Sequence, residues 1–471
     1  MVTFNEEIFR GYDLRGIAGK DLDVERMGAL GKAYATFLYQ RRIWEVVVGR
    51  DNRLTSKEYS DAFIKGLVES GVDVVDIGLS LSQIVYFGQY FFRFKGAAMI
   101  TASHNPAEYN GLKMAVGFSD TMITEEIQEF KKIALSGEFK KFDRQTKVWQ
   151  QDIFEEYKKD IIRRVGKIVK CKVVIDTSNS TSGMFMPSLL RDVGCEVVEQ
   201  NTTLDGNFPL GTPDPTERDV QERLAKEVLE NGADIGFSYD ADGDRMGVVD
   251  GKGRLIWNDT LVAIFAKDVL EYLPGAKIVF NTLCSKQVRD VIEEMGGKPL
   301  IWITGHSFIK AKIKEERVPY GGELSGHMFF TDNFYGHDDE AYATLRLLAY
   351  LTRIGKTLAQ VVDELPQYKS SPEIKVGCPD DYKFDLISQK ITGDIKKAFP
   401  NAQFVTIDGI RFDTKNEMGV VRASQNGPYI TVKYEAKDEE NFERLRKELS
   451  SILHKYPEID FSKGVNTDAF D

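Results

Sequence analysis

The sequence has few cysteines, no long apolar run and no excess of basic residues, and each absence excludes a class of protein. Only four of its 471 residues are cysteines, and they form no CxxC pair. We therefore expect free thiols, and neither a zinc site nor a dense disulfide framework. No apolar stretch reaches the roughly 18 residues that a membrane span requires. The N-terminal residues show no basic start followed by an apolar run, so no signal peptide is expected and the predicted location is cytoplasmic. The cysteines are Cys171, Cys195, Cys284 and Cys378.

The charge balance argues against a nucleic-acid partner. The formal net charge is -11, whereas binding to a phosphate backbone requires a surplus of Lys and Arg. Neither nucleic acid nor a membrane is expected as a partner, although a small anion can still bind to a local cluster of basic side chains. The composition, 42% hydrophobic and 29% charged, is that of an ordinary globular protein. A chain of 471 residues exceeds one hydrophobic core, which predicts three or four domains.

Short apolar runs alternate with amphipathic stretches over most of the chain, a pattern that predicts α/β layers with partly parallel sheets. The pattern restarts near residues 170, 275 and 375. The predicted strands are Glu45–Val48, Ala97–Thr101, Val173–Asp176, Ile235–Tyr239 and Ile278–Asn281. The predicted helices are Val24–Tyr39, Ser56–Glu69, Asp152–Val165, Glu217–Glu230, Ser285–Met295 and Asp339–Thr352.

The C-terminal part follows a different pattern. Gly419–Ala423 and Tyr429–Glu435 resemble a hairpin around a polar loop, and a charged helix is predicted at Glu439–His454. We therefore expect an α/β fold with three similar α/β domains that contain mixed sheets, followed by a smaller C-terminal α+β domain.

The first segment that suggests chemistry is Thr101–Pro106, directly after a predicted strand. Strand ends that lead into polar loops are where α/β folds bind ligands. Ser103 offers a hydroxyl there and His104 a neighbouring donor or acid. Taken alone, the segment fits a plain turn rich in Ser, Asn and Pro better than a functional site.

The second segment is Asp240–Arg245, in which carboxylates alternate along the chain after a strand. Oxygen ligands in this pattern favour a hard cation such as Mg²⁺, and Arg245 adds a fixed positive charge. A solvated acidic turn is the plain alternative, and a calcium EF-hand loop is the rival cation site. The EF-hand loop fails because Arg245 stands where the loop needs Gly and Gly251 stands where it needs Glu.

Two further loops suggest a polar ligand. In Gly321–His327, Glu323 and Ser325 occupy alternate positions, so their side chains would point the same way in an extended loop. An acceptor and a hydroxyl on one side suit the hydroxyls of a sugar. In Arg422–Pro428, an arginine, a serine and loop amides suit a phosphate. Taken alone, the first loop fits a Gly-rich turn better than a binding loop, and the second fits a plain hairpin loop with Gly-Pro better.

The five histidines divide into two groups. His104 and His327 fall inside the segments above, and His306 follows Thr304-Gly305 at a predicted strand-to-helix turn. His337 and His454 are expected to lie on the surface.

With these segments the sequence resembles the α-D-phosphohexomutase family, most closely its phosphomannomutase/phosphoglucomutase branch. The resemblance covers essentially the whole chain, and five segments occur in the family's order. They are the opening segment Phe9–Gly16, the phosphoserine loop Thr101–Pro106, the metal loop Asp240–Arg245, the sugar-binding loop Gly322–His327 and the phosphate-binding loop Arg422–Pro428.

The resemblance implies a fold and an activity. It implies four domains around a central cleft, each of which contributes one loop, with boundaries at residues 1–150, 151–256, 257–368 and 369–471. It also implies a mutase that interconverts the 1-phosphate and 6-phosphate of mannose or glucose through a phosphoserine. A hexose 1,6-bisphosphate would be the intermediate and activator, small sugar phosphates the partners, and a monomer or homodimer the active form.

The resemblance further implies the role of each site residue. One Mg²⁺ would be held by a phosphate oxygen on Ser103 and by Asp240, Asp242 and Asp244. The implied catalytic residues are Ser103, His104, Lys113, Arg245, His327 and Arg15. The implied substrate-binding residues are Tyr12, Arg15, Thr304, Gly305, His306, Glu323, Ser325, His327, Arg422, Ser424 and Asn426.

The sequence departs from the family pattern at the end that binds the second phosphate. Gln425-Asn426-Gly427 stands where the family commonly has Asn-Thr-Glu, and Leu283 replaces a lysine that often precedes Cys-Thr or Cys-Ser. Leu324 is closer to the Met of the phosphomannomutase/phosphoglucomutase branch than to the Gln of phosphoglucosamine mutases.

Three alternatives stay open from the sequence. A phosphoglucosamine mutase would use the same loops on an amino sugar. A metal-dependent sugar phosphatase would pass the phosphate to water and release it. A non-catalytic sugar-phosphate sensor would bind and not turn over, but the complete set of Ser103 and three aspartates argues against it.

Overall fold

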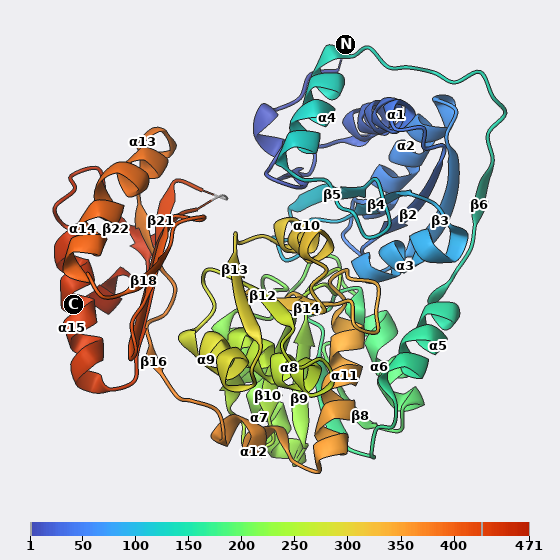
Figure 1. Ribbon diagram of the computed structural model, residues 1–471. Coiled ribbons are helices and arrows are strands. Elements are labelled where there is room, and N and C mark those ends of the chain that lie inside the picture. Colours follow the sequence, from blue (N-terminus) through green and yellow to red (C-terminus); the bar gives the residue numbers. More distant parts are fainter. Residues whose placement is uncertain (1, 425–426, 471) are drawn as a thin grey trace. The chain divides into compact units, whose positions relative to one another are not determined.

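The computed structural model describes residues 2–424 and 427–470 (Figure 1). These residues form two compact units. The first unit extends to residue 258 and includes residues 325–363. The second unit contains residues 259–324 and the chain from residue 364 onward. Within the described ranges, no helix has the length and apolar character needed to cross a membrane.

The first unit begins with a mixed six-stranded sheet. Its strands, in spatial order, are β1 (Leu14–Ile17), β5 (Tyr109–Ala115), β4 (Gly96–Ile100), β2 (Glu45–Arg50), β3 (Asp73–Leu79) and β6 (Val148–Gln150). The pairs from β4 to β6 are parallel, and β5 is antiparallel to both of its neighbours. A short 3-10 helix, Glu6–Ile8, precedes this sheet.

Helices cover both faces of this sheet (Figure 1). One face is covered by α1 (Val24–Gln40), α2 (Ser56–Glu69) and α4 (Thr124–Ser136), and the other by α3 (Ser82–Phe92). Two glycines allow α1 and α2 to approach closely, because a Cβ on Gly31 would lie 2.2 Å from Phe63 O and one on Gly66 2.2 Å from Gly28 O.

A second mixed sheet completes the first unit. Its order is β11 (Leu255–Ile256), β10 (Met246–Asp250), β9 (Ile235–Tyr239), β7 (Lys172–Asp176) and β8 (Glu196–Gln200). The remaining elements of this unit are α5 (Phe154–Val165), α6 (Ser182–Asp192), α7 (Arg218–Asn231), β15 (Met328–Phe330), α11 (Glu340–Ile354) and α12 (Leu358–Asp363). Strand β9 is buried along its whole length and ends immediately before Asp240, so the acidic loop starts at a fixed point.

The second unit contains a parallel sheet and an antiparallel one. The parallel strands are β13 (Lys298–Trp302), β12 (Lys277–Asn281) and β14 (Tyr320–Gly322), with helices α8 (Asn258–Tyr272), α9 (Lys286–Glu294) and α10 (His306–Glu316). The antiparallel order is β18 (Gln403–Val405), β19 (Ile410–Asp413), β20 (Glu417–Ala423), β21 (Tyr429–Ala436), β17 (Ile374–Gly377) and β22 (Asp460–Val465), and β16 (Lys369–Ser370) also pairs with β21.

Helices cover one face of the antiparallel sheet (Figure 1). They are α13 (Asp380–Asp385), the π-helical turn Leu386–Ile391, α14 (Thr392–Ala398), α15 (Glu439–Leu453) and the 3-10 turn Thr467–Phe470. Apolar side chains of all of these elements except α13 form one core with Phe412, Val432 and Tyr434 of the sheet, whereas Tyr382 and Phe384 of α13 are exposed.

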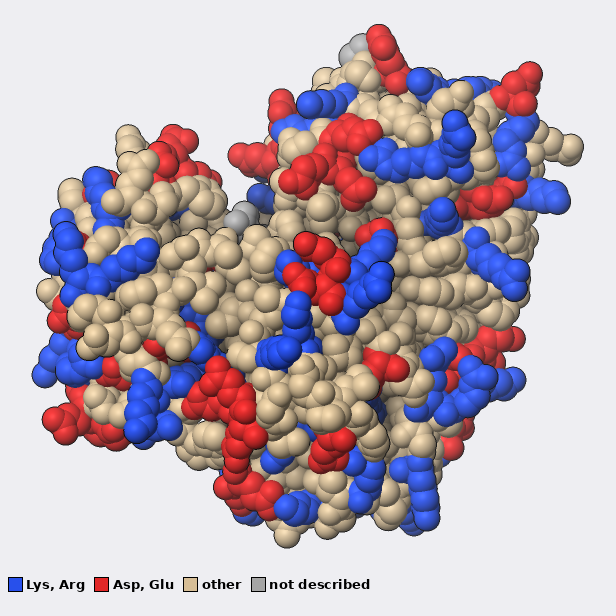
Figure 2. Space-filling model, in the orientation of Figure 1, with Lys and Arg blue, Asp and Glu red and all other residues tan. Residues whose placement is uncertain are grey.

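The predicted fold class is confirmed, as are the elements named from the sequence. The predicted strand Ile235–Tyr239 and helix Ser56–Glu69 match β9 and α2 at both ends, and the C-terminal hairpin is the antiparallel pair β20–β21. The prediction that His337 lies on the surface is wrong, because its side chain is fully buried. Basic and acidic side chains are interspersed on the face shown in Figure 2, in keeping with the modest net charge.

Candidate active site

Ser103 lies in a buried turn directly after β4. Its backbone has a left-handed φ of 51°, which is uncommon for a residue other than glycine. Its backbone N donates a hydrogen bond to Thr101 Oγ1 over 2.8 Å. The Ser103 hydroxyl donates to Asp240 Oδ2 over 2.8 Å and lies 3.1 Å from His104 Nδ1. The turn therefore places one hydroxyl against the first carboxylate of the acidic loop.

Arg53 holds the backbone of this turn. Its guanidinium donates to the carbonyl oxygens of Ser103 and Asn105, each over 2.6 Å, and to those of Pro106 (2.7 Å) and Tyr109 (3.0 Å). Asp51 accepts from Arg53 Nε over 3.1 Å, and both side chains are fully buried. The sequence analysis missed Arg53, since no local pattern links it to a turn 50 residues away.

The three aspartates of the acidic loop converge at the end of β9. All three are fully buried, and one oxygen from each lies within 4.8 Å of the others, a set that can hold a metal ion. Asp242 Oδ2 accepts from Ser82 Oγ over 2.5 Å and from Lys113 Nζ over 2.6 Å, and the Lys113 ammonium also contacts Asp244.

Lys113 alone does not balance the negative charge of the three aspartates. Burial and the neighbouring carboxylates of Asp242 and Asp244 raise the pKa of Asp240 well above its ordinary value. Burial lowers the pKa of Lys113, but Asp242 and Asp244 outweigh burial and raise it well above its ordinary value. Among the described residues, Asp242 Oδ1 is buried without a hydrogen-bond partner. An unsatisfied carboxylate oxygen in an acidic cluster fits a divalent cation with oxygen ligands.

Arg245 and His327 lie beside the acidic cluster. Arg245 Nε donates to His327 Nε2 over 3.2 Å, and Arg245 Nη1 lies 3.6 Å from Asp214 Oδ2. His327 Nδ1 lies 3.1 Å from Asp338 Oδ2 and 3.9 Å from Asp244 Oδ1. The sequence analysis missed Asp338, because an acidic run before a predicted helix is typical of an N-terminal cap, the role that Asp339 does have.

The predicted residues His104, Arg15 and Tyr12 belong to the same unit. Burial and the positive charge of Arg245 lower the pKa of His104 well below its ordinary value. Arg15 Nε donates to Asp13 Oδ2 over 2.9 Å, and its guanidinium also contacts Asn105 in the serine turn. Tyr12 is half-buried just before β1.

Most residues predicted to bind the sugar and the second phosphate belong to the second unit. Gly305 N donates to Glu323 Oε1 over 2.7 Å, at the turn that leads into α10 with His306. Thr304 N and Arg422 Nε both donate to Asp408 Oδ2, over 3.1 and 2.8 Å.

The predicted residues Ser424, Ser325 and Asn426 have different positions. The Ser424 carbonyl, at the start of the phosphate-binding loop, accepts from the buried Lys383 over 2.7 Å, and Lys383 also reaches Gly427 O over 2.8 Å. Ser325 is half-buried and belongs to the first unit. Asn426 lies outside the described residues.

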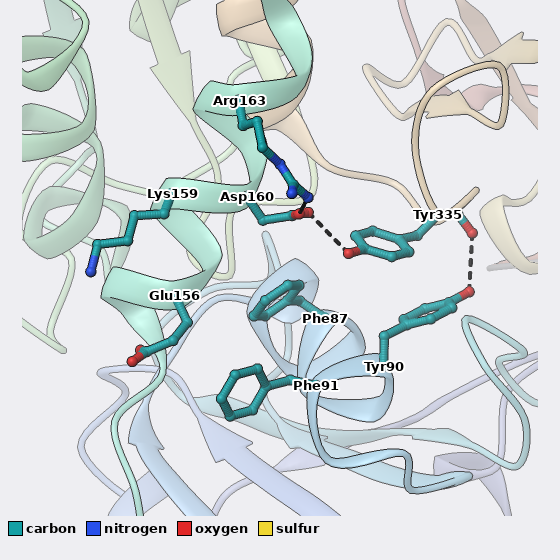
Figure 3. A pocket seen from close by; sticks show the side chains of 8 residues that line it. All are labelled: Phe87, Tyr90, Phe91, Glu156, Lys159, Asp160, Arg163 and Tyr335. Carbon is teal, nitrogen blue, oxygen red and sulfur yellow. Dashed lines mark hydrogen bonds and ion pairs between the residues drawn. The ribbon is translucent and has the colours of Figure 1, made fainter.

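A separate pocket in the first unit lies between α3 and α5 (Figure 3). Aromatic rings of α3 and Tyr335 line it, with charged side chains of α5 at its rim. Tyr335 Oη donates to Asp160 Oδ2 over 2.9 Å, and Tyr90 Oη donates to Tyr335 O over 3.2 Å. The predicted site residues are not among those that line this pocket.

Family models match three consecutive parts of the chain. Phosphoglucomutase/phosphomannomutase alpha/beta/alpha domain I matches residues 6–141, domain II residues 153–253 and domain III residues 257–368. The chain belongs to the phosphoglucomutase/phosphomannomutase family. The domain I match includes Ser103 and Lys113, and the domain II match includes Asp240–Arg245.

Individual members of the family align over nearly their full length. The phosphomannomutase/phosphoglucomutase of Pseudomonas putida is 37% identical over 96% of this chain and 97% of that protein. The phosphoglucomutase of Neisseria gonorrhoeae is 34% identical over 98% of this chain and 99% of that protein. A crystal structure of a phosphoglucomutase/phosphomannomutase family protein from Burkholderia thailandensis superposes with a TM-score of 0.89, at 32% identity, over 96% of this chain and 98% of that one.

Proposed function

We propose that this chain interconverts the 1-phosphate and 6-phosphate of glucose, mannose or both, with Ser103 as the phosphate carrier. The observation that carries the proposal is the 2.8 Å contact between the Ser103 hydroxyl and Asp240, the first of three convergent aspartates. Relatives of 34–37% identity over nearly the full length are named for this activity, which supports the proposal. The proposal also includes four domains around one cleft, with the boundaries expected from the sequence.

The metal of the proposed site is Mg²⁺. Asp240, Asp242 and Asp244, with a phosphate oxygen on Ser103, would hold it, and it would supply Lewis-acid stabilisation of the transferred phosphoryl group. The buried, unsatisfied Asp242 Oδ1 fits this assignment.

Two phosphoryl transfers complete the reaction. In the first, the bond between phosphorus and the Ser103 oxygen breaks, a bond forms to the free hydroxyl of the hexose monophosphate, and a general base takes the hydroxyl proton. The product is a hexose 1,6-bisphosphate, which acts as the activator when supplied from solution. In the second, the other phosphate returns to Ser103 and the sugar oxygen that it leaves regains a proton.

The first unit provides the groups for these steps. Burial and the charge of Arg245 lower the pKa of His104, which favours the neutral imidazole that can accept the hydroxyl proton, and His327 beside Arg245 is the second candidate base. Asp242 and Asp244 outweigh burial and raise the pKa of Lys113, which favours its charged form, and this ammonium offsets negative charge together with Arg245 and Arg15. Phosphoryl transfer depends mainly on such positioning and charge stabilisation.

The second unit provides most of the groups for the rest of the substrate. In the proposal, Glu323 and the Thr304–His306 turn bind sugar hydroxyls, as Ser325 does from the first unit. Arg422 and Ser424 bind the phosphate that does not react, and Tyr12 of the first unit lines the reacting end. The proposed location is the cytoplasm, which free cysteines suit, and the proposed assembly is a monomer or homodimer.

A coupled assay tests the proposal. Mannose 1-phosphate, glucose 1-phosphate and glucosamine 1-phosphate are each supplied with Mg²⁺ and a trace of the matching 1,6-bisphosphate. We expect 6-phosphate from the mannose or glucose compound, and none from Ser103→Ala. Release of inorganic phosphate without isomerisation would identify a phosphatase instead, and turnover of the glucosamine compound alone would identify a phosphoglucosamine mutase.

A further inference from the structure

One carboxylate oxygen of Asp408 joins two parts of the second unit. Asp408 lies in the turn between β18 and β19, and its Oδ2 accepts from Arg422 Nε over 2.8 Å. The same oxygen accepts from Thr304 N over 3.1 Å and from Thr282 Oγ1 over 3.0 Å. Asp408 is 7% exposed and Arg422 5%. The carboxylate thus connects an arginine on β20 to the ends of β12 and β13.

The backbone around Asp408 is built for this contact. The next residue, Gly409, has a left-handed φ of 75°. A Cβ at Gly409 would lie 2.3 Å from Val421 O and 2.6 Å from the Cα of Arg422. Only glycine allows the turn to approach β20 so closely, and this approach places the Asp408 carboxylate beside the guanidinium.

The contact continues toward the proposed sugar-binding residues. Thr304, which donates its N–H to Asp408, is followed by Gly305, whose N–H donates to Glu323 Oε1 over 2.7 Å. A short series of hydrogen bonds therefore leads from the proposed phosphate-binding arginine through Asp408 to the proposed hydroxyl-binding glutamate.

We propose that Asp408 is a positioning residue that fixes Arg422 relative to the Thr304–Gly305 turn. The inference rests on the proposed function and adds to it the residue that sets the distance between the phosphate contact and the hydroxyl contacts of a hexose monophosphate. The contact to Arg422 uses one of the five N–H donors of a guanidinium and is charge-assisted. An arginine held in this way loses less side-chain freedom when the phosphate binds.

The test compares Asp408→Asn with Glu417→Gln in the mutase assay. Both changes turn a buried carboxylate of the C-terminal sheet region into an amide, but Glu417 pairs with Arg444 and not with a proposed site residue. Because the non-reacting phosphate is bound alike in the ground and transition states, we expect Asp408→Asn to raise KM about 10-fold with kcat changed less than about 3-fold. Glu417→Gln should leave both constants at the wild-type level.

A double-mutant cycle separates positioning from general stability. If Asp408 acts through Arg422, Asp408→Asn should raise KM much less in an Arg422→Lys background than in the wild type. Thermal unfolding of each variant without substrate shows whether the fold is intact, and Asp408→Ala offers a second variant with the acceptor removed.

The outcomes separate the proposed function from the role of Asp408. A wild-type chain that does not isomerise hexose phosphates overturns the proposed function. An active wild type whose KM is unchanged in both Asp408 variants overturns the role of Asp408 alone. Equal effects of Asp408→Asn with and without Arg422→Lys overturn it as well, because the two residues would then act independently.

Discussion

Replacement of Arg53 should disable the serine turn while substrate binding is preserved. Arg53 makes four contacts of 2.6–3.0 Å to backbone carbonyls around Ser103, and its Nε contacts Asp51. Lysine keeps the charge but offers three donors at a single point, so it cannot reproduce the planar arrangement of the guanidinium.

The magnitude follows from the complete burial of the Arg53–Asp51 pair. Removal of one partner of a buried ion pair costs about 3–5 kcal/mol, because the other charge is left uncompensated. Arg53→Ala should lower the free energy of unfolding by that amount, and Arg53→Lys by less. The left-handed Ser103 is held by this turn, and a shift of about 1 Å in a reacting group can cost about 100-fold in rate.

Two measurements check this prediction. Urea unfolding gives the stability of each variant, and steady-state kinetics with glucose 1-phosphate gives kcat and KM. We expect Arg53→Lys to lower kcat roughly 10- to 100-fold with little change in KM. The control is Arg41→Lys. Arg41 pairs with the partly exposed Glu129, so loss of this ion pair costs at most about 1 kcal/mol. A folded Arg53→Lys protein with wild-type kcat would refute the reasoning.

Three further predictions concern the same unit. Burial raises the pKa of Glu340 well above its ordinary value, which favours the protonated carboxyl in the folded state. The destabilisation grows by about 1.4 kcal/mol per pH unit above the ordinary pKa of about 4.3 until the folded pKa is reached, and Glu340→Gln should remove it. Cys171 and Cys195 have Sγ atoms 3.4 Å apart, so a small disulfide oxidant should convert both thiols to one disulfide and lower the count of alkylated cysteines from four to two. Asp242→Asn should raise the Mg²⁺ concentration for half-maximal activity at least roughly 10-fold, and a chelator should abolish turnover of the wild type.

Each of these predictions has a result that contradicts it. For Glu340→Gln, it is a stability difference from wild type that stays constant between pH 5 and pH 7 in chemical denaturation. For the thiols, it is an unchanged alkylation count after oxidation, with Cys195→Ser as the control that cannot form the bond. For Asp242→Asn, it is the same Mg²⁺ dependence as the wild type.

The sequence predicted the elements and the loops that follow them, because both are encoded locally. Apolar runs identified β4 and β9, and the polar residues directly after them are Ser103 and Asp240. Their 2.8 Å contact joins residues 137 apart, and it was anticipated only because the family resemblance implies that Ser103 and the three aspartates share one metal ion.

The supporting residues could not be predicted in this way. Arg53 and Lys383 act on backbone far along the chain, Asp338 contacts His327 on the other side of β15, and nothing in their neighbourhoods distinguishes them from ordinary polar residues. The local sequence was also misleading for His337, which was predicted to be exposed. Its neighbours are polar, yet it is buried by stacking on Tyr335 and by contact of its Nδ1 with Ser119 over 2.9 Å.

The structure shows what Leu283 contacts at the position where the family often has a lysine. As a departure from the family's lysine it suggested only a lost contact to the substrate. In the structure its side chain forms an apolar cluster with Met418 and Val420 of β20, and the half-buried Leu324 packs against it. Its carbonyl accepts from Lys433 Nζ over 3.2 Å. A lysine at position 283 would need to remove its charge from this apolar contact. The leucine therefore joins the segment after β12 to the C-terminal sheet, next to Thr282, which contacts Asp408.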